Sequence, residues 1–107
     1  MTGSRRVKRF RIDFTQEARD DLSEIAAYVA QDSSVNAARF TAKIRKSIQP
    51  LADFPNRSPK APEGYRAGLQ VRQRLLGDYR ILFVVHGATV SIVGIRHGRR
   101  LPIIAPQ

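Results

Sequence analysis

The chain contains no cysteine and no tryptophan, and only two histidines, His86 and His97, among its 107 residues. Without cysteine there is no disulfide framework, no zinc ribbon and no thiol nucleophile. Two histidines do not by themselves complete a structural metal site, so we expect no metal and no cofactor. The longest apolar run, 81–85, is far shorter than the roughly 20 residues of a membrane span. These absences predict a cytoplasmic protein that does not contact a membrane.

Acidic residues are scarce. Nine Asp and Glu stand against nineteen Lys and Arg, which gives a net charge of +10 at neutral pH. Such a balance favours an anionic partner, either nucleic acid or an acidic protein segment, although a soluble protein with a neutral partner is the alternative. Six of the nine acids lie between residues 13 and 32, whereas basic residues dominate 5–11 and 57–100. This segregation predicts a positive face outside the early acidic element.

Hydropathy patterns predict a strand and two helices in the first half of the chain. Phe10, Ile12 and Phe14 alternate with charged residues, as in a half-buried strand. Thr15 is suited to cap a helix, which we expect to run to about residue 30 along one apolar stripe. After a short break, apolar residues at helical spacing predict a second, antiparallel helix that ends near Pro50.

The second half of the chain predicts a connecting loop and three strands. Residues 55–68 contain three prolines and two glycines, so we expect a loop there. The segments 69–75, 79–85 and 89–95 have the alternation or β-branched content of strands. The order predicts an α+β fold: an N-terminal strand and an antiparallel helical hairpin packed on a mainly antiparallel, three- to four-stranded sheet. We expect one domain over residues 1–107, with its core at about 8–100 and tails at 1–7 and 101–107.

Several short segments, in this order and spacing, resemble the RelE/ParE toxins of type II toxin–antitoxin systems. The similar segments are FT at 14–15, FP at 54–55, VR at 71–72, YRILF at 79–83 and IRHGRR at 95–100. The likeness covers about residues 8–100. It implies a small α+β toxin and a cognate acidic antitoxin, which wraps and neutralises the toxin in a hetero-oligomer.

One branch of this family, the RelE-like endoribonucleases, cuts messenger RNA on the ribosome. Cleavage beside a 2′-hydroxyl needs a base, an acid and cations for the developing charge. If this chain were such a nuclease, its catalytic residues would be His97, Arg80 and Arg72. However, the end of the chain offers no further base or acid for this reaction. No side chain after Arg100 titrates, and all three tyrosines precede His97. The sequence therefore favours the nuclease less than the other branch.

The other branch, ParE-like and including plasmid stabilization proteins, binds DNA gyrase and arrests growth without chemistry of its own. The ending His97-Gly98-Arg99-Arg100 resembles this branch more closely. The resemblance implies a target-binding set of seven residues. They are Arg72, Arg74, Arg80, Arg96, His97, Arg99 and Arg100. A third reading is a non-toxic basic domain that binds RNA.

Each of these residues also has a simpler interpretation. Arg72 and Arg74 fit the solvated face of a strand, and a histidine beside a turn is often a structural hydrogen-bonding residue. Arg80 could pair with an acid of the first helix, such as Glu17 or Asp21, and hold that helix to the sheet. These alternatives stay open at the level of sequence.

The expected antitoxin also has a physical basis in the sequence. A strongly basic protein with edge strands and an exposed hydrophobic groove attracts an acidic, amphipathic segment that folds on binding. The apolar C-terminal residues Leu101, Ile103 and Ile104 are candidates for docking in that complex or in a toxin dimer, and a frayed tail is the alternative.

Overall fold

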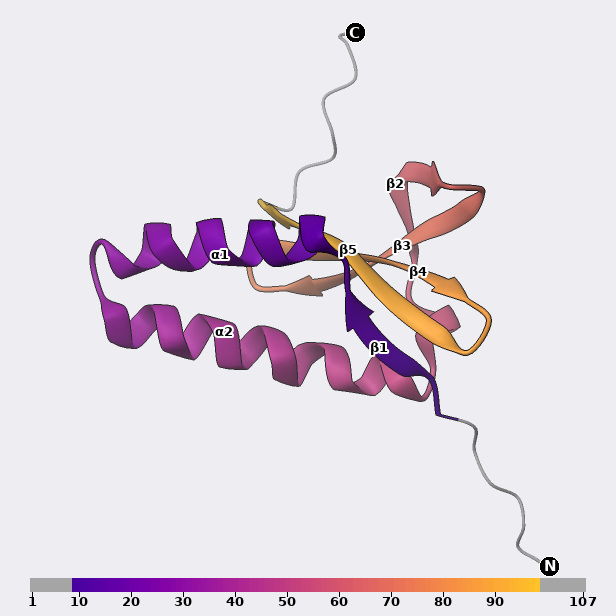
Figure 1. Ribbon diagram of the computed structural model, residues 1–107, viewed down its shortest axis with the longest axis horizontal. Coiled ribbons are helices and arrows are strands. Elements are labelled where there is room, and N and C mark those ends of the chain that lie inside the picture. Colours follow the sequence, from indigo (N-terminus) through magenta and orange to yellow (C-terminus); the bar gives the residue numbers. More distant parts are fainter. Residues whose placement is uncertain (1–8, 99–107) are drawn as a thin grey trace, which may run out of the picture.

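The computed structural model describes residues 9–98, which form five strands in one sheet, two α-helices and two short 3-10 helices (Figure 1). In chain order the elements are β1 (Arg11–Phe14), α1 (Gln16–Ala30), α2 (Ser34–Ile48), η2 (Gln49–Ala52), η3 (Pro55–Arg57), β2 (Lys60–Arg66), β3 (Leu69–Leu76), β4 (Tyr79–His86) and β5 (Thr89–His97). The strand order in the sheet is β1-β5-β4-β3-β2. Only the β1–β5 pair is parallel among these strands.

Side-chain caps fix where the two α-helices begin. The Thr15 hydroxyl accepts a hydrogen bond from the Ala18 amide at 3.1 Å, and it also donates to the Ile92 carbonyl of β5 at 3.2 Å. Ser33 caps α2 by accepting from the Asn36 amide at 3.0 Å. Each cap satisfies an amide that has no partner within its helix. The predicted start of the first helix at Thr15 and its end near residue 30 are confirmed.

The sheet buries apolar side chains on both faces, which explains the unbroken apolar run of β4. On the face that the helices cover, Ile81 and Phe83 pack with the α2 residues Ile44 and Ile48. Leu82 and the other alternate residues point to the opposite face, where they form a second cluster. That cluster consists of Ala61, Val71, Leu82, Val84 and Val93. A strand buried on both sides has no polar face to show in its sequence.

The sheet has one strand more than the sequence predicted. Residues 60–66 form β2, where the sequence predicted part of a loop and therefore a sheet of three or four strands. β2 is an edge strand whose register with β3 shifts between Lys60 and Tyr65. Pro62 and Gly64 are tolerated there because an edge strand needs hydrogen bonds on one side only. Pro62, one of the three prolines that predicted a loop, thus lies within an irregular edge strand.

The remaining boundaries follow the sequence closely. α2 ends at Ile48, and Pro50 lies in the 3-10 turn η2 that continues the chain irregularly, as its missing amide predicts. Of the two helices in residues 9–98, neither is long and apolar enough to cross a bilayer. The predicted tails 1–7 and 101–107 lie outside the described residues.

Candidate target-binding surface

The register of the sheet divides the predicted target-binding residues between its two faces. On β3, Arg72 lies opposite Phe83 and Arg74 opposite Ile81, so both arginines emerge on the face that carries the helices. Arg80 on β4 lies opposite Arg96 on β5, and this pair belongs to the other face. Paired residues share a face and neighbours in a strand alternate. The structure therefore brings Arg80 and Arg96 together and separates them from the β3 arginines.

Arg80 is enclosed by the protein. Its side chain is 4% exposed, and its two terminal nitrogens donate to the two Glu63 carboxylate oxygens at 3.0 and 2.6 Å. A further bond goes to the Gln73 side-chain oxygen at 2.9 Å. The Arg80 hydrogen bonds hold the pKa of Glu63 below its ordinary value, although burial acts in the opposite direction. This guanidinium is already occupied by a fork-shaped ion pair.

The acid that pairs with Arg80 differs from the acids suggested by the sequence. Glu17 and Asp21 were the predicted alternatives, but Glu63 of β2 is the partner, and it reaches β4 across the intervening strand β3. Because residues 60–66 were expected to form a loop, nothing in the sequence indicated that Glu63 lies beside β4. The prediction that Arg80 pairs with an acid is confirmed, whereas the prediction that the first helix supplies this acid is wrong.

Asp21 on α1 instead secures the end of β5. One of its carboxylate oxygens lies 2.8 Å from an Arg96 terminal nitrogen and also accepts the Ile95 amide at 3.0 Å. β1 pairs with β5 only as far as Ile92, so the α1 carboxylate takes the place of a neighbouring strand beyond that residue. The Arg96 side chain is 40% exposed, which leaves part of it open to solvent beside its ion pair.

The two β3 arginines tie the strand to neighbouring elements through single hydrogen bonds. Arg72 donates to the Ser58 carbonyl at 2.7 Å, and Arg74 donates through Nε to the Ser47 hydroxyl of α2 at 3.2 Å. Both side chains are half-buried. The structure thus supports a partly structural role for each of them, with the remaining guanidinium nitrogens available to a partner.

His97 is exposed at the end of β5, and its ring packs edge-to-face against one aromatic side chain, that of Tyr79. Its ring centroid lies 5.0 Å from that of Tyr79 in an edge-to-face arrangement, and Tyr79 lies 4.8 Å from Phe40. The ring also lines a cavity of about 310 Å³ together with Ile25 and Tyr28 of α1. Arg99 and Arg100, which follow it in the sequence, lie outside the described residues. Tyr79 packs against the main core.

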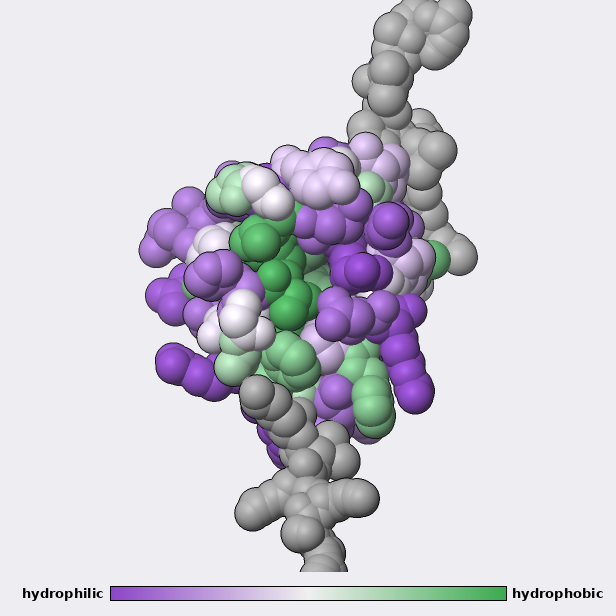
Figure 2. Space-filling model, turned by 90° about the vertical axis from the view of Figure 1, so that its right-hand side faces the viewer, coloured by the Kyte–Doolittle hydropathy of each residue, from purple (hydrophilic) through white to green (hydrophobic). Residues whose placement is uncertain are grey.

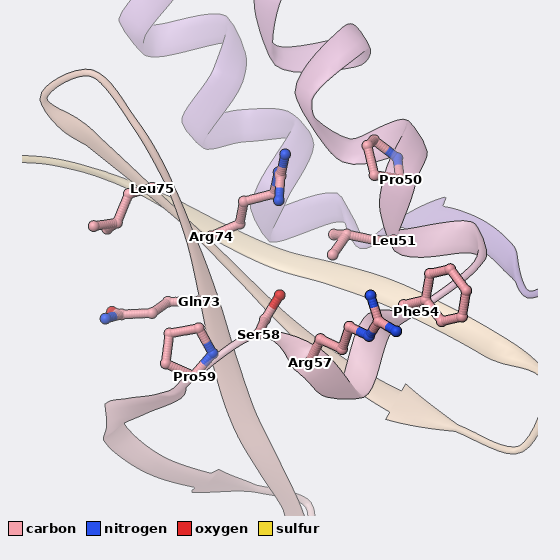
Figure 3. A pocket seen from close by; sticks show the side chains of 9 residues that line it. All are labelled: Pro50, Leu51, Phe54, Arg57, Ser58, Pro59, Gln73, Arg74 and Leu75. Atoms are coloured by element: carbon pink, nitrogen blue, oxygen red, sulfur yellow. The ribbon is translucent and has the colours of Figure 1, made fainter.

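A groove that the sequence did not identify lies between β3 and the segment of η2 and η3 (Figure 3). Its volume is about 470 Å³. The lining residues are Pro50, Leu51, Phe54, Arg57, Ser58, Pro59, Gln73, Arg74 and Leu75. The Arg57 guanidinium carbon lies 4.2 Å from the centre of the half-exposed Phe54 ring. The groove combines apolar walls with two cations, and the sequence feature that could have indicated it is an aromatic and a basic residue, Phe54 and Arg57, on either side of Pro55.

Apolar surface is also exposed at one end of the molecule. Figure 2 shows a strip of hydrophobic side chains flanked by hydrophilic ones on the end that carries the β2–β3 and β4–β5 turns. Within residues 9–98, no three His, Asp or Glu side chains are grouped so that they could hold a metal ion.

Comparisons with known proteins agree on one family. The profile of the ParE toxin of type II toxin–antitoxin systems, parDE, matches residues 12–102. Toxin RelE2 of Caulobacter vibrioides is 32% identical over 88 residues, which are 82% of this chain and 94% of that protein. A chain of the chromosomal ParDE system from P. aeruginosa has a TM-score of 0.69 at 23% identity, and the match covers 86% of this chain and 99% of that one.

A second solved structure has the same fold. A chain of the RelBE2 toxin–antitoxin complex from Mycobacterium tuberculosis matches with a TM-score of 0.57 at 20% identity, over 89% of this chain and 98% of that one. The family profile spans most of the chain, and two helices on a mostly antiparallel sheet are what the solved structures share with it. The chain belongs to the ParE toxin family, within the RelE/ParE superfamily of type II toxins.

Proposed function

We propose that this toxin arrests growth in the cytoplasm by binding a protein target, DNA gyrase, without cleaving RNA, and that a cognate antitoxin neutralises it. The observation that carries the proposal is the separation of the three residues that a nuclease would use. Arg80 is buried against Glu63 and belongs to the opposite face of the sheet from Arg72 and His97. A cation for phosphate must be accessible to substrate, and this one is enclosed.

Distance along the sheet supports the same conclusion. Arg72 on β3 pairs with Phe83 of β4, and His97 on β5 pairs with Tyr79 of β4. Arg72 and His97 are therefore two strands apart across the sheet and four residues apart along the strand direction. At about 3.4 Å per residue along a strand and about 4.8 Å between strands, their backbones are roughly 17 Å apart. A base and a phosphate-binding cation act within hydrogen-bond reach of one scissile group. The separation favours a binding surface over a catalytic centre.

The C-terminal group of predicted residues is the surface we propose for the target. Asp21 holds Arg96 at the end of β5, and His97 follows it at an exposed position. Arg99 and Arg100 continue this basic segment in the sequence. Guanidinium groups recognise carboxylates with good geometry, so an acidic surface of the target is the matching chemistry.

The proposal of an antitoxin partner is supported by the net charge of the chain and by its structural similarity to toxins. The chain carries a net charge of +10, and the solved structures with its fold come from toxin–antitoxin systems. An acidic protein encoded beside the toxin is the partner we propose. Inducible expression of the toxin alone is expected to stop growth, and co-expression of that acidic protein is expected to restore it. Growth without arrest would favour the third reading, a non-toxic RNA-binding domain.

Two assays run side by side distinguish gyrase binding from RNA cleavage. The purified toxin is expected to inhibit supercoiling by gyrase and to leave ribosome-bound messenger RNA intact. Arg99→Ala/Arg100→Ala is expected to lose inhibition while keeping the thermal unfolding temperature of the wild-type chain. Arg19→Ala/Arg39→Ala, which removes two exposed arginines on the helices, is the control of equal charge.

The RelE-like endoribonuclease is retained as the second candidate because of one finding. The relative with 32% identity is a protein called Toxin RelE2. If that activity holds here, messages on the ribosome will be cut by the wild-type chain and left intact by His97→Ala. Intact messages together with inhibited supercoiling would exclude it.

A further inference from the structure

The cavity beside His97 differs in charge from the groove of Figure 3. It lies between α1 and the ends of β4 and β5, and its volume is about 310 Å³. The lining residues are Glu24, Ile25, Tyr28, Tyr79 and His97. This lining contains one carboxylate and no Lys or Arg, whereas the lining of the groove contains two arginines and no carboxylate. In a chain with a net charge of +10, this cavity is a place that favours a cation.

The secondary structure explains how these five side chains converge. Glu24 and Tyr28 are four residues apart on α1, so they lie on one face of the helix. Tyr79 and His97 are directly opposite each other on β4 and β5, and their ring centroids are 5.0 Å apart. The half-buried Ile25 and Tyr79 pack against the main core and form the inner part of the cavity. The exposed Glu24, Tyr28 and His97 form its mouth.

The Glu24 carboxylate has no cation within residues 9–98. Two other acids of α1 are neutralised there, because Asp21 pairs with Arg96 and Glu17 pairs with Arg66. None of the four ion pairs in the described part of the chain involves Glu24. Physiological salt screens the more distant charges of the molecule beyond roughly 8 Å, so this carboxylate sets the local preference for a cation.

The aromatic part of the lining selects the kind of cation. Tyr28 is 71% exposed, so most of its ring is open to a ligand. A guanidinium group stacks on the face of an aromatic ring and also pairs with a carboxylate through its fork of N–H donors. A volume of about 310 Å³ is at the lower end of the range of ligand sites, roughly 300–1,000 Å³, which suits a single side chain. The lining therefore fits one arginine side chain of a partner.

We propose that this cavity binds an arginine side chain on the surface of the target protein, with its guanidinium paired to Glu24 and stacked on Tyr28. The inference rests on the proposed function, because His97 belongs to the C-terminal group that contacts the target there. An acidic antitoxin segment is disfavoured here, since its carboxylates would meet Glu24. A target that offers carboxylates to the basic segment and an arginine to the cavity is recognised through both signs of charge, which fixes the register of docking.

Two small probes test the cavity directly in the purified toxin. N-acetylarginine methylamide carries a guanidinium group, and N-acetylcitrulline methylamide carries a neutral urea group of the same shape. Titration with each probe is followed by NMR through the ring signals of Tyr28 and His97. We expect the arginine probe to bind at least about tenfold more tightly than the citrulline probe. Equal binding of the two probes overturns the proposal.

Substitutions separate the carboxylate from the ring, once thermal unfolding has established that each variant is folded. In Glu24→Gln, the preference for the arginine probe is expected to fall to about twofold or less. Asp20→Asn removes the same charge from an exposed site one turn away on α1 and is expected to keep the preference. Tyr28→Leu is expected to weaken binding of the arginine probe at least about threefold, whereas Tyr65→Leu, at a tyrosine that is 70% exposed on β2, is expected to leave it unchanged. A preference that survives in Glu24→Gln overturns the proposal.

The supercoiling assay tests the contact with the target. Half-inhibition of gyrase is expected to require at least about fivefold more Glu24→Gln toxin than wild-type toxin. Asp20→Asn is expected to stay within about twofold of wild type. An unchanged half-inhibiting concentration for Glu24→Gln overturns the proposed contact.

The outcomes separate this inference from the proposed function. If the toxin inhibits gyrase and the two probes bind equally, the assignment of the cavity is wrong and gyrase remains the target. If the cavity prefers the arginine probe and the toxin does not inhibit gyrase, the proposed function is wrong and the partner named here is overturned with it. If only Arg99→Ala/Arg100→Ala binds the arginine probe, arginines of this chain occupy the cavity and the contact with the target is overturned.

Discussion

At the scale of single residues, the Arg80–Glu63 pair is the contact whose loss should cost the most. Arg80 as a whole residue is 3% exposed, and its side chain makes two hydrogen bonds to Glu63 and one to Gln73. Removing one member of a buried pair leaves the other charge uncompensated. We expect Glu63→Ala to lower the free energy of unfolding by about 3 kcal/mol, measured by urea denaturation.

A double substitution shows whether the lost stability belongs to the unpaired charge. Arg80→Met/Glu63→Leu removes both charges, and we expect it to recover more than half of the loss because no buried ion remains. Arg39→Ala, at an exposed position on α2, should change the free energy of unfolding by no more than about 0.5 kcal/mol. If the double variant is as unstable as Glu63→Ala, the penalty comes from packing and the electrostatic account is wrong.

The same pair predicts how stability depends on pH. Hydrogen bonds from Arg80 hold the pKa of Glu63 below its ordinary value of 4.5. A carboxyl whose pKa is lower in the folded state stabilises the fold fully above its unfolded pKa, and that contribution is lost as the pH falls through the folded pKa. We expect the difference in unfolding free energy between wild type and Glu63→Gln to be constant above about pH 5 and to shrink below about pH 4.5. A difference that does not change with pH would contradict this account.

At the scale of elements, the sequence predicted the helices and strands whose signals lie in residues close together in the chain. The helix starts rest on Thr15 and Ser33, which bond to amides three residues away, and the strands 69–76 and 79–86 rest on alternation and β-branching. β2 was missed because its evidence is not local: Pro62 and Gly64 are acceptable only at an edge, and the edge is defined by the partner strand. Identifying β2 required knowing that β3 had a free side.

The turn between β2 and β3 contains a residue that does not suit its conformation. Ala67 has φ of 49° and the following Gly68 has φ of 80°, so both central residues of the turn are left-handed. A side chain in this region costs about 1 kcal/mol, which glycine avoids. We expect Ala67→Gly to raise the free energy of unfolding by about 0.5 kcal/mol. Ala27→Gly, the same substitution at an exposed helical site, should lower it by about 1 kcal/mol.

The edge of β5 depends on a carboxylate from a helix. Asp21 accepts the Ile95 amide and pairs with Arg96, whereas its neighbour Asp20 bonds only to the exposed Gln16 among the described residues. We expect Asp21→Asn to lower the free energy of unfolding by about 1–2 kcal/mol and to speed exchange of the Ile95 amide. Asp20→Asn makes the same change of charge one residue away and should have little effect. Equal effects of the two substitutions would mean that Asp21 acts through net charge alone.

At the scale of the whole molecule, the sequence predicted the amount of positive charge but not where each guanidinium points. Arg72 and Arg80 lie on opposite faces because the strand register separates them, and register is set by contacts between distant segments. Four of the nine acids hold arginines in ion pairs within residues 9–98. The sequence could therefore indicate a basic protein and its family, while the division into an enclosed arginine, a C-terminal group and a basic groove required the fold.

The charge that remains unpaired predicts how the antitoxin complex responds to salt. Attraction between a protein of charge +10 and an acidic partner acts over distances that salt screens, whereas short-range apolar contacts act only after docking. Raising the salt concentration from about 0.05 M to about 0.5 M should slow association at least tenfold, while dissociation should change by no more than about threefold. Stopped-flow mixing measures the association rate, and dilution or competition measures the dissociation rate. If salt acts mainly on dissociation, charge holds the docked complex together, and apolar contacts do not set its lifetime.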